Sequence, residues 1–276
     1  RMGSTKRGGV DVIHVLLDPN CDHGHHTFAD SANNGPVGRA LVEELIPAID
    51  KRFRTTGAKG RLVGGHSSGG WSSLWLQVEY PDAFDGCWST APDPVDFRDF
   101  QRVDLYEPKA NLLFGPDGKS RPIARMGGKV AMRFKPFSDM ERVMGHGGQL
   151  ASFEAVFSGR GPDGEPKRLW DRDTGAVDAE VAKSWRKYDI RSKLARGWET
   201  LGPKLKGKLH VYMGEEDTFY LEGATRLLKK QMEELKSDAK VELFPEKDHS
   251  GLLDGALRDR IGKEMAARLK AVGAVE

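Results

Sequence analysis

The sequence predicts an α/β protein with a mostly parallel β-sheet and helices on both faces. Short apolar runs alternate with segments whose apolar residues recur at helical spacing, a pattern typical of βαβ units. The apolar runs are nearly continuous, as expected of strands that are buried on both faces. With 276 residues, the chain is long enough for one such domain with its own core.

The elements follow one another in this order. Strands are predicted at residues 10–17, 61–65, 87–91, 208–213 and 241–244, the first of them in the interior of the sheet. Helices are predicted from the apolar positions Val42, Leu45, Ile46 and Ile49, then Trp71, Leu74, Trp75 and Val78, then Leu221, Ala224, Leu228, Met232 and Leu235, and finally over residues 253–269. Pro36 suits the start of the first helix, and Pro47 is expected to kink or divide it.

The most informative motif is the GxSxG pentapeptide at residues 65–69, between the strand that ends near Val63 and the helix that begins near Trp71. A strand, a sharp turn and a helix in this order predict a nucleophile elbow, whose glycines leave room for a strained turn. Ser67 is the predicted nucleophile. The backbone N–H of Ser68, at a helix start, is the predicted donor to an oxyanion. Taken alone, the pentapeptide also fits an ordinary Ser/Gly turn.

Two later strand ends complete the pattern. Asp217 follows the strand at 208–213, and His249 follows the strand at 241–244. The order Ser, Asp, His is that of α/β-hydrolase triads and not the chymotrypsin or subtilisin order. A serine hydroxyl needs a neutral imidazole to take its proton, and that imidazole needs a carboxylate to hold it. Glu215 and Glu216 are competing acids, but Asp217 has the shorter side chain and directly precedes the next helix.

Residues 95–200 lack regular alternation, so we expect a cap or lid insertion over the active site of a single domain that spans residues 1–276. The basic residues of the chain are interleaved with acids, and the formal net charge is only +2. No nucleic-acid partner is therefore expected. No apolar run approaches membrane-spanning length, so no membrane partner is expected either. The compartment, periplasmic or secreted against cytoplasmic, and the oligomeric state stay open.

The chain resembles a known family in three segments: residues 42–50 (VEELIPAID), residues 65–70 (GHSSGG) and residues 80–86 (YPDAFDG). They are similar to the core of the putative-esterase family, which includes esterase D, enterochelin esterase, feruloyl esterases and the mycolyltransferases. The resemblance covers residues 10–92 and 205–255. It implies an α/β-hydrolase fold with Ser67 as nucleophile, Asp217 as acid and His249 as base, the same roles that the spacing predicts.

The resemblance also exposes a departure. Family members carry further strands ahead of the one predicted at 10–17, together with a Gly-rich loop whose N–H completes the oxyanion hole. Residues 1–9 are short, basic and polar, and the chain does not begin with Met. We therefore expect a chain that lacks its N-terminal strands and one oxyanion donor, a loss worth about 10²- to 10³-fold in rate.

The segment from Cys21 to His26 contains three histidines and a thiol, which are possible zinc ligands. We favour a pocket-lining or solvated loop and expect no metal, because no spaced partner pair is evident elsewhere in the chain. Substrate-binding side chains are predicted in this region and at the elbow: His25, His26, Asn33, Asn34 and His66. With only two cysteines, Cys21 and Cys87, no disulfide framework is expected.

The predicted function is a serine carboxylic ester hydrolase that works through an acyl-enzyme without a cofactor. Its expected substrate is a small-molecule or carbohydrate-linked ester. An acyltransferase on the same fold is the near alternative. A non-catalytic binding module that keeps the elbow but lacks a complete oxyanion hole is the alternative from another class.

Overall fold

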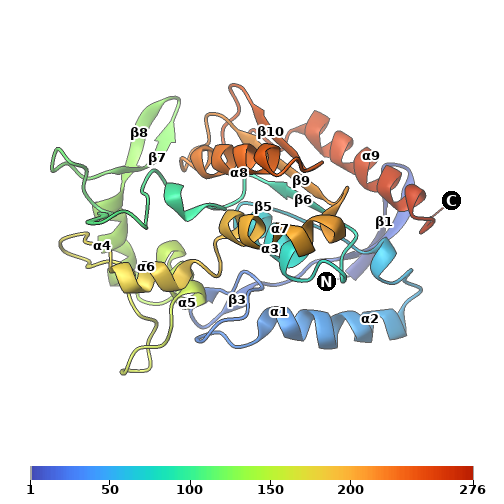
Figure 1. Cartoon of the computed structure of the whole chain (residues 1–276), viewed down its shortest axis with the longest axis horizontal. Coiled ribbons are helices and arrows are strands. Elements are labelled where there is room, and N and C mark those ends of the chain that lie inside the picture. Colours follow the sequence, from blue (N-terminus) through green and yellow to red (C-terminus); the bar gives the residue numbers. More distant parts are fainter. Residues whose placement is uncertain (1, 276) are drawn as a thin grey trace.

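A four-stranded parallel sheet forms the centre of the molecule. The computed structural model describes residues 2–275. The strands are β5 (Leu62–His66), β6 (Gly86–Thr90), β9 (Leu209–Gly214) and β10 (Lys240–Phe244), in the order β10-β9-β6-β5. All three neighbouring pairs are parallel. The loops that leave the carboxyl ends of these strands therefore gather at one edge of the sheet (Figure 1).

Helices cover both faces of this sheet, as predicted. Three helices share one core with Cys87 and Val211: α3 (Ser68–Glu79), α7 (Ile190–Leu205) and α8 (Glu222–Glu234). On the opposite face, Trp88 and Tyr212 pack against α9 (Gly255–Ala271). Neighbouring residues of one strand thus enter different cores, because successive side chains of a strand point to opposite faces. The predicted fold class is confirmed.

The N-terminal segment departs from the prediction. β2 (Val10–Val15) pairs with β1 (Met2–Arg7) as an antiparallel hairpin outside the parallel sheet. Gly8 and Gly9 both have positive φ, as a two-residue hairpin turn requires. Val10 is buried against α9, whereas Ile13 is 39% exposed. The interior strand predicted at 10–17 is therefore wrong: the double glycine pairs this apolar run with the segment directly before it.

A continuous helical segment follows two short strands, β3 (Asn20–Cys21) and β4 (Gly24–His25). It consists of α1 (Val37–Ala40), a π-helical turn (Leu41–Leu45) and α2 (Ile46–Arg52). The π-helical turn ends at Leu45, two residues before Pro47. A wider turn accommodates a residue that lacks an N–H and crowds the preceding carbonyl. Pro47 therefore coincides with a change of helix type, and the segment continues. A 3₁₀ turn (Ala58–Gly60) precedes β5.

The insertion at 95–200 contains more regular structure than the sequence predicts. Its elements are a 3₁₀ turn (Phe97–Asp99), the hairpin β7 (Pro122–Met126) and β8 (Lys129–Arg133), and the helices α4 (Phe134–Met144), α5 (Gln149–Phe157) and α6 (Ala179–Trp185), before α7 begins. Helices α5 and α6, with nine and seven residues, are too short for a clear periodic signal. Asp178 nevertheless caps α6, and such a cap is readable in a sequence.

Aromatic packing joins the insertion to the helix that follows the elbow. Phe157 lies 5.1 Å from both Trp71 of α3 and Trp185 of α6, measured between ring centroids. In Figure 1, the hairpin and helices α4 to α6 lie together beside the sheet, on the side away from α9. Insertion and sheet therefore share one hydrophobic core. No helix within residues 2–275 has the length and apolar character that crossing a bilayer requires.

Candidate active site

Ser67 occupies the strained turn that the motif predicts. It lies between β5 and α3 with φ 59° and ψ −124°, a left-handed backbone conformation that costs a residue with a side chain about 1–3 kcal/mol. Its N–H donates to the carbonyl of Thr90 at 3.0 Å, which fixes the turn to β6. A Cβ on Gly65 would lie 2.3 Å from the carbonyl oxygen of Gly69, so only glycine fits there. The local sequence thus builds the elbow.

Ser68 is the first residue of α3, so its N–H is one of the groups that no carbonyl within the helix accepts. Together with the helix dipole, this places a donor with partial positive charge next to Ser67. The hydroxyl of Ser68 points elsewhere and donates to Asp93 Oδ2 at 2.6 Å. The Ser68 side chain therefore contacts Asp93, and its backbone N–H remains at the start of α3 beside Ser67.

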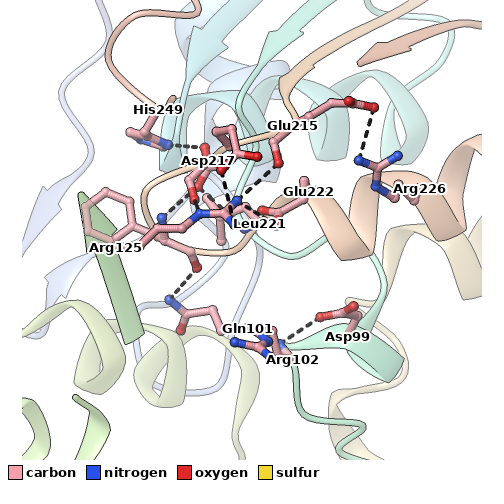
Figure 2. A network of polar contacts seen from close by, with 12 residues as sticks. Asp99, Gln101, Arg102, Arg125, Glu215, Asp217, Leu221, Glu222, Arg226 and His249 are labelled. Carbon is pink, nitrogen blue, oxygen red and sulfur yellow. Dashed lines mark hydrogen bonds and ion pairs between the residues drawn. The ribbon is translucent and has the colours of Figure 1, made fainter. Parts of the chain in front are cut away.

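Asp217 and His249 are in direct contact. His249 Nδ1 lies 2.7 Å from Asp217 Oδ2, and Figure 2 shows the two side chains pointing toward each other. Asp217 is fully buried, and His249 is 8% exposed. The other oxygen of Asp217, Oδ1, accepts from the N–H of Phe219 at 2.9 Å. With Nδ1 engaged by the carboxylate, Nε2 is the ring nitrogen left to exchange a proton with a substrate or nucleophile.

The competing acids face other partners. Glu215 pairs with Arg226 at 3.1 Å, and Glu216 lies 3.6 Å from Arg125. Of the three carboxylates after β9, only Asp217 contacts His249 among the described residues.

His66 and Phe219 flank the ring of His249. The His66 ring lies 4.7 Å from it, and the Phe219 ring stands edge-on at 5.0 Å. Burial lowers the pKa of His66, and the neighbouring His249 lowers it further, so the neutral form of His66 is favoured. No hydrogen bond joins Ser67 and His249 among the described residues. Such catalytic contacts are often long without substrate.

Arg125, on β7, donates hydrogen bonds to the loop that carries Asp217, and no sequence motif predicts these contacts. Its Nε donates to the Asp217 carbonyl at 2.9 Å, and its Nη2 donates to Glu222 Oε1 at 2.8 Å and to the Glu215 carbonyl at 3.1 Å. Its backbone N–H also donates to Thr218 O at 2.7 Å. In Figure 2, Arg125 lies against this loop and points its guanidinium at Glu222.

A chain of polar side chains reaches the elbow from the insertion, and no sequence motif predicts it. Gln149, at the start of α5, donates from Nε2 to Ser68 Oγ at 3.0 Å. Its Oε1 lies 3.2 Å from His25 Nε2. The chain ends at Asp93, whose pKa burial raises to about 6 although Ser68 donates to it. Asp93 follows β6, a strand end at which the sequence analysis placed no site residue.

The predicted substrate-binding residues fall into two groups. His66 and His25 lie near the elbow. His66 lies beside His249, and His25 contacts Gln149, which in turn donates to Ser68. Asn33, in contrast, donates to the carbonyls of Ala155 and Ser158, at 2.9 and 3.0 Å, and so attaches its loop to α5.

Two further predicted residues also make contacts within their own loop. His26 is buried, and its Nδ1 accepts from the N–H of Phe28 at 3.1 Å. Asn34 Oδ1 accepts from Cys21 Sγ at 3.6 Å. Both cysteines, Cys21 and Cys87, are free thiols.

Comparison with known proteins places the chain in a family. Residues 17–251 match the family described as Putative esterase. No curated protein sequence matches the chain.

Three similar solved structures share little sequence with it. An S-formylglutathione hydrolase from Agrobacterium tumefaciens is 17% identical, with a TM-score of 0.49, over 89% of this chain and 64% of its own. The fluorophosphonate-binding serine hydrolase FphF from Staphylococcus aureus is 12% identical, with a TM-score of 0.49, over 94% and 72%. A carboxylesterase from Nitrososphaera gargenis is 17% identical, with a TM-score of 0.45, over 95% and 82%. The chain thus spans less than two thirds of the length of the Agrobacterium enzyme.

The family match covers well over half of the chain. The topology agrees with it, since the elbow serine follows one parallel strand, and the acid and the histidine follow the ends of two others. The chain has an α/β-hydrolase fold and belongs to the Putative esterase family.

Proposed function

We propose that this chain is a serine carboxylic ester hydrolase that works through an acyl-enzyme, with Ser67 as nucleophile, His249 as base and Asp217 as the acid that orients it. The observation that carries the proposal is the buried contact between His249 Nδ1 and Asp217, at the same sheet edge as the strained Ser67. An imidazole held through Nδ1 presents Nε2 as a base. A left-handed turn at a helix start presents a hydroxyl beside unpaired N–H groups.

The residues divide the reaction as follows. Ser67 Oγ attacks the acyl carbon while His249 Nε2 takes the hydroxyl proton, and Asp217 stabilises the imidazolium that forms. The carbonyl oxygen becomes an oxyanion and accepts from the Ser68 N–H. His249 then gives its proton to the departing alcohol, which leaves the acyl group on Ser67. A water molecule attacks this ester, its proton goes to His249, and the collapse of the second oxyanion returns the proton to Ser67.

The expected substrate is a small-molecule or carbohydrate-linked ester. An acyltransferase would use the same acyl-enzyme and differ only in the second acceptor, an alcohol in place of water. A binding module would keep the fold without forming the acyl-enzyme.

Labelling with a fluorophosphonate probe tests the proposal, because the probe forms a covalent bond only with an activated serine. Wild-type protein should label, and Ser67→Ala should not label and should lose ester turnover. The matched control is Ser184→Ala, which removes an exposed serine hydroxyl on α6. Equal labelling of wild type and Ser67→Ala would refute the assignment. Adding a primary alcohol to the turnover assay distinguishes a hydrolase from a transferase. A hydrolase releases mainly the free carboxylic acid, whereas a transferase forms mainly a new ester with the added alcohol.

A further inference from the structure

Three potential metal ligands from distant parts of the sequence meet at the surface of the insertion. They are His23, in the turn between β3 and β4, His146, in the loop between α4 and α5, and Glu165, in the turn after α5. One ligand atom of each lies within 4.8 Å of the others. The rings of His23 and His146 meet edge to face at 5.3 Å, and His146 Nε2 lies 4.0 Å from Glu165 Oε2.

The backbone beneath His23 and His146 is tightly fixed. Ser152 Oγ, on α5, lies 3.1 Å from the His23 carbonyl, to which it can donate, and accepts from the His25 N–H at 3.3 Å. Gly24 has φ +108°, and a Cβ there would lie 2.1 Å from Ser152 Oγ and 3.0 Å from the Gly147 Cα. Glycine at position 24 therefore allows the hairpin to approach the loop that carries His146. Two of the three ligand segments are in backbone contact before any ion binds.

The third segment is a closed turn. The Gly161 N–H donates to the Glu165 carbonyl at 2.6 Å, and the Glu165 N–H donates to Asp163 Oδ1 at 3.1 Å. Arg160, at its base, donates to the carbonyl of Ala32 at 3.3 Å. The position of the Glu165 Cα is thus set by hydrogen bonds, while its exposed side chain is free to rotate toward the histidines.

We propose that His23, His146 and Glu165 bind one Zn²⁺ ion, with water in the fourth position. Two imidazoles and one carboxylate are a ligand set that zinc accepts. Zinc–ligand bonds of about 2.0–2.2 Å place neighbouring ligand atoms of a tetrahedron roughly 3.4 Å apart. The 4.0 Å between His146 and Glu165 exceeds a hydrogen bond, and a small side-chain rotation brings the pair to the zinc-bound spacing. The neutral histidines and one carboxylate leave the complex with one net positive charge.

The ion would connect three segments of the chain close to the candidate active site. His25 lies two residues after His23, and it reaches the elbow through Gln149 and Ser68. Zinc at this position would hold the β3–β4 hairpin against the insertion. Its role is to stabilise this arrangement, and the proposed ester chemistry does not pass through it.

Zinc titration tests the proposal. The protein for this experiment carries no added histidine tag and is first dialysed against a chelator. We expect one Zn²⁺ per chain by calorimetry near neutral pH, a higher Tm with zinc, and slower proteolysis of the turn that carries Glu165. Calcium should not reproduce these effects, because it prefers oxygen ligands. Co²⁺ bound in place of zinc should show the visible absorption of a four-coordinate site.

Variants identify the ligands. His146→Ala and Glu165→Gln should each lower zinc affinity at least tenfold and remove the effect on Tm. Asp22→Asn, an exposed acid beside His23, and His14→Ala, a histidine outside the cluster, should bind zinc as wild type does. No binding by wild type, or unchanged binding by both ligand variants, would overturn the proposal. Zinc binding is measured without any ester substrate, so its result is independent of the proposed catalytic residues.

Discussion

At the scale of single residues, three carboxylates after β9 differ in what they contact. Asp217 is buried against His249, whereas Glu215 and Glu216 face arginines. Asp217→Asn keeps the size of the side chain but removes the charge that stabilises the imidazolium and favours the wrong ring tautomer. We expect a loss of about 10⁴-fold in kcat. Glu215→Gln and Glu216→Gln are the controls and should stay close to wild type in steady-state assays of ester turnover. If a glutamate variant is the inactive one, the acid is misassigned.

Asp93 predicts a pH dependence of stability. Burial raises its pKa from 3.8 to about 6 in the folded chain, so the folded state binds a proton that the unfolded state has already released between about pH 4 and pH 6. Stability from this group is therefore greatest below pH 4 and falls as the pH rises through 6. Asp93→Asn removes the titration and keeps an acceptor for Ser68.

Urea unfolding of both proteins between pH 4 and pH 7 checks this. Relative to Asp93→Asn, wild type should lose about 2 kcal/mol of unfolding free energy over that range, most of the roughly 3 kcal/mol that a pKa raised from 3.8 to about 6 is worth in full. Subtracting the unfolding free energy of Asp93→Asn from that of wild type at each pH cancels the contributions of the other titrating groups. A difference that does not change with pH would contradict the expectation.

Among the elements of the fold, the β7–β8 hairpin contacts the loop of the proposed catalytic acid, Asp217, through one side chain. Arg125 donates to two carbonyls of the loop after β9 and to Glu222. Arg125→Met should loosen this loop and lower kcat by roughly 10- to 100-fold with a smaller change in KM, because displacements near 1 Å at a catalytic group cost about that much. Arg133→Met, on the exposed partner strand, is the control and should change kcat little.

A merely structural role for Arg125 would give a different result. If the arginine only stabilises the hairpin, Arg125→Met should lower the Tm and leave kcat of the folded protein unchanged. Arg125→Lys retains one donor, and partial recovery of kcat with that variant would support the positioning role.

At the scale of the whole molecule, insertion and sheet share one core, so they should unfold together. Trp185 is buried among aromatic side chains of the insertion and donates from Nε1 to Ser158 Oγ at 2.9 Å. Trp185→Ala should cost about 3–5 kcal/mol. Calorimetry should show this cost as a lower Tm of a single transition. Two separate transitions, with only one shifted, would mean that the insertion is an independent domain.

A feature of this molecule can be predicted from the sequence when neighbouring residues determine it. It cannot be predicted when it depends on contacts between segments that are far apart in the chain. The elbow is local: Gly65 and Ser67 are confined to a turn whose geometry follows from five residues. Asp217 and His249 were predictable because parallel strands bring their carboxyl ends to one edge whatever fills the space around them. Local sequence patterns are therefore sufficient to predict the fold class and the three residues that we propose for catalysis.

The surroundings of these three residues follow from tertiary packing, which brings Arg125 and Gln149 of the insertion and Asp93 after β6 to the site. Arg125, Gln149 and Asp93 have no motif, since their partners lie on other elements and meet them only when the aromatic core forms. The same holds for His23: the sequence offered it neighbouring histidines, whereas folding places it beside His146 and Glu165. A strand end is fixed by hydrogen bonding to the next strand, but contacts between loops depend on the packing of the whole chain, which no short pattern encodes.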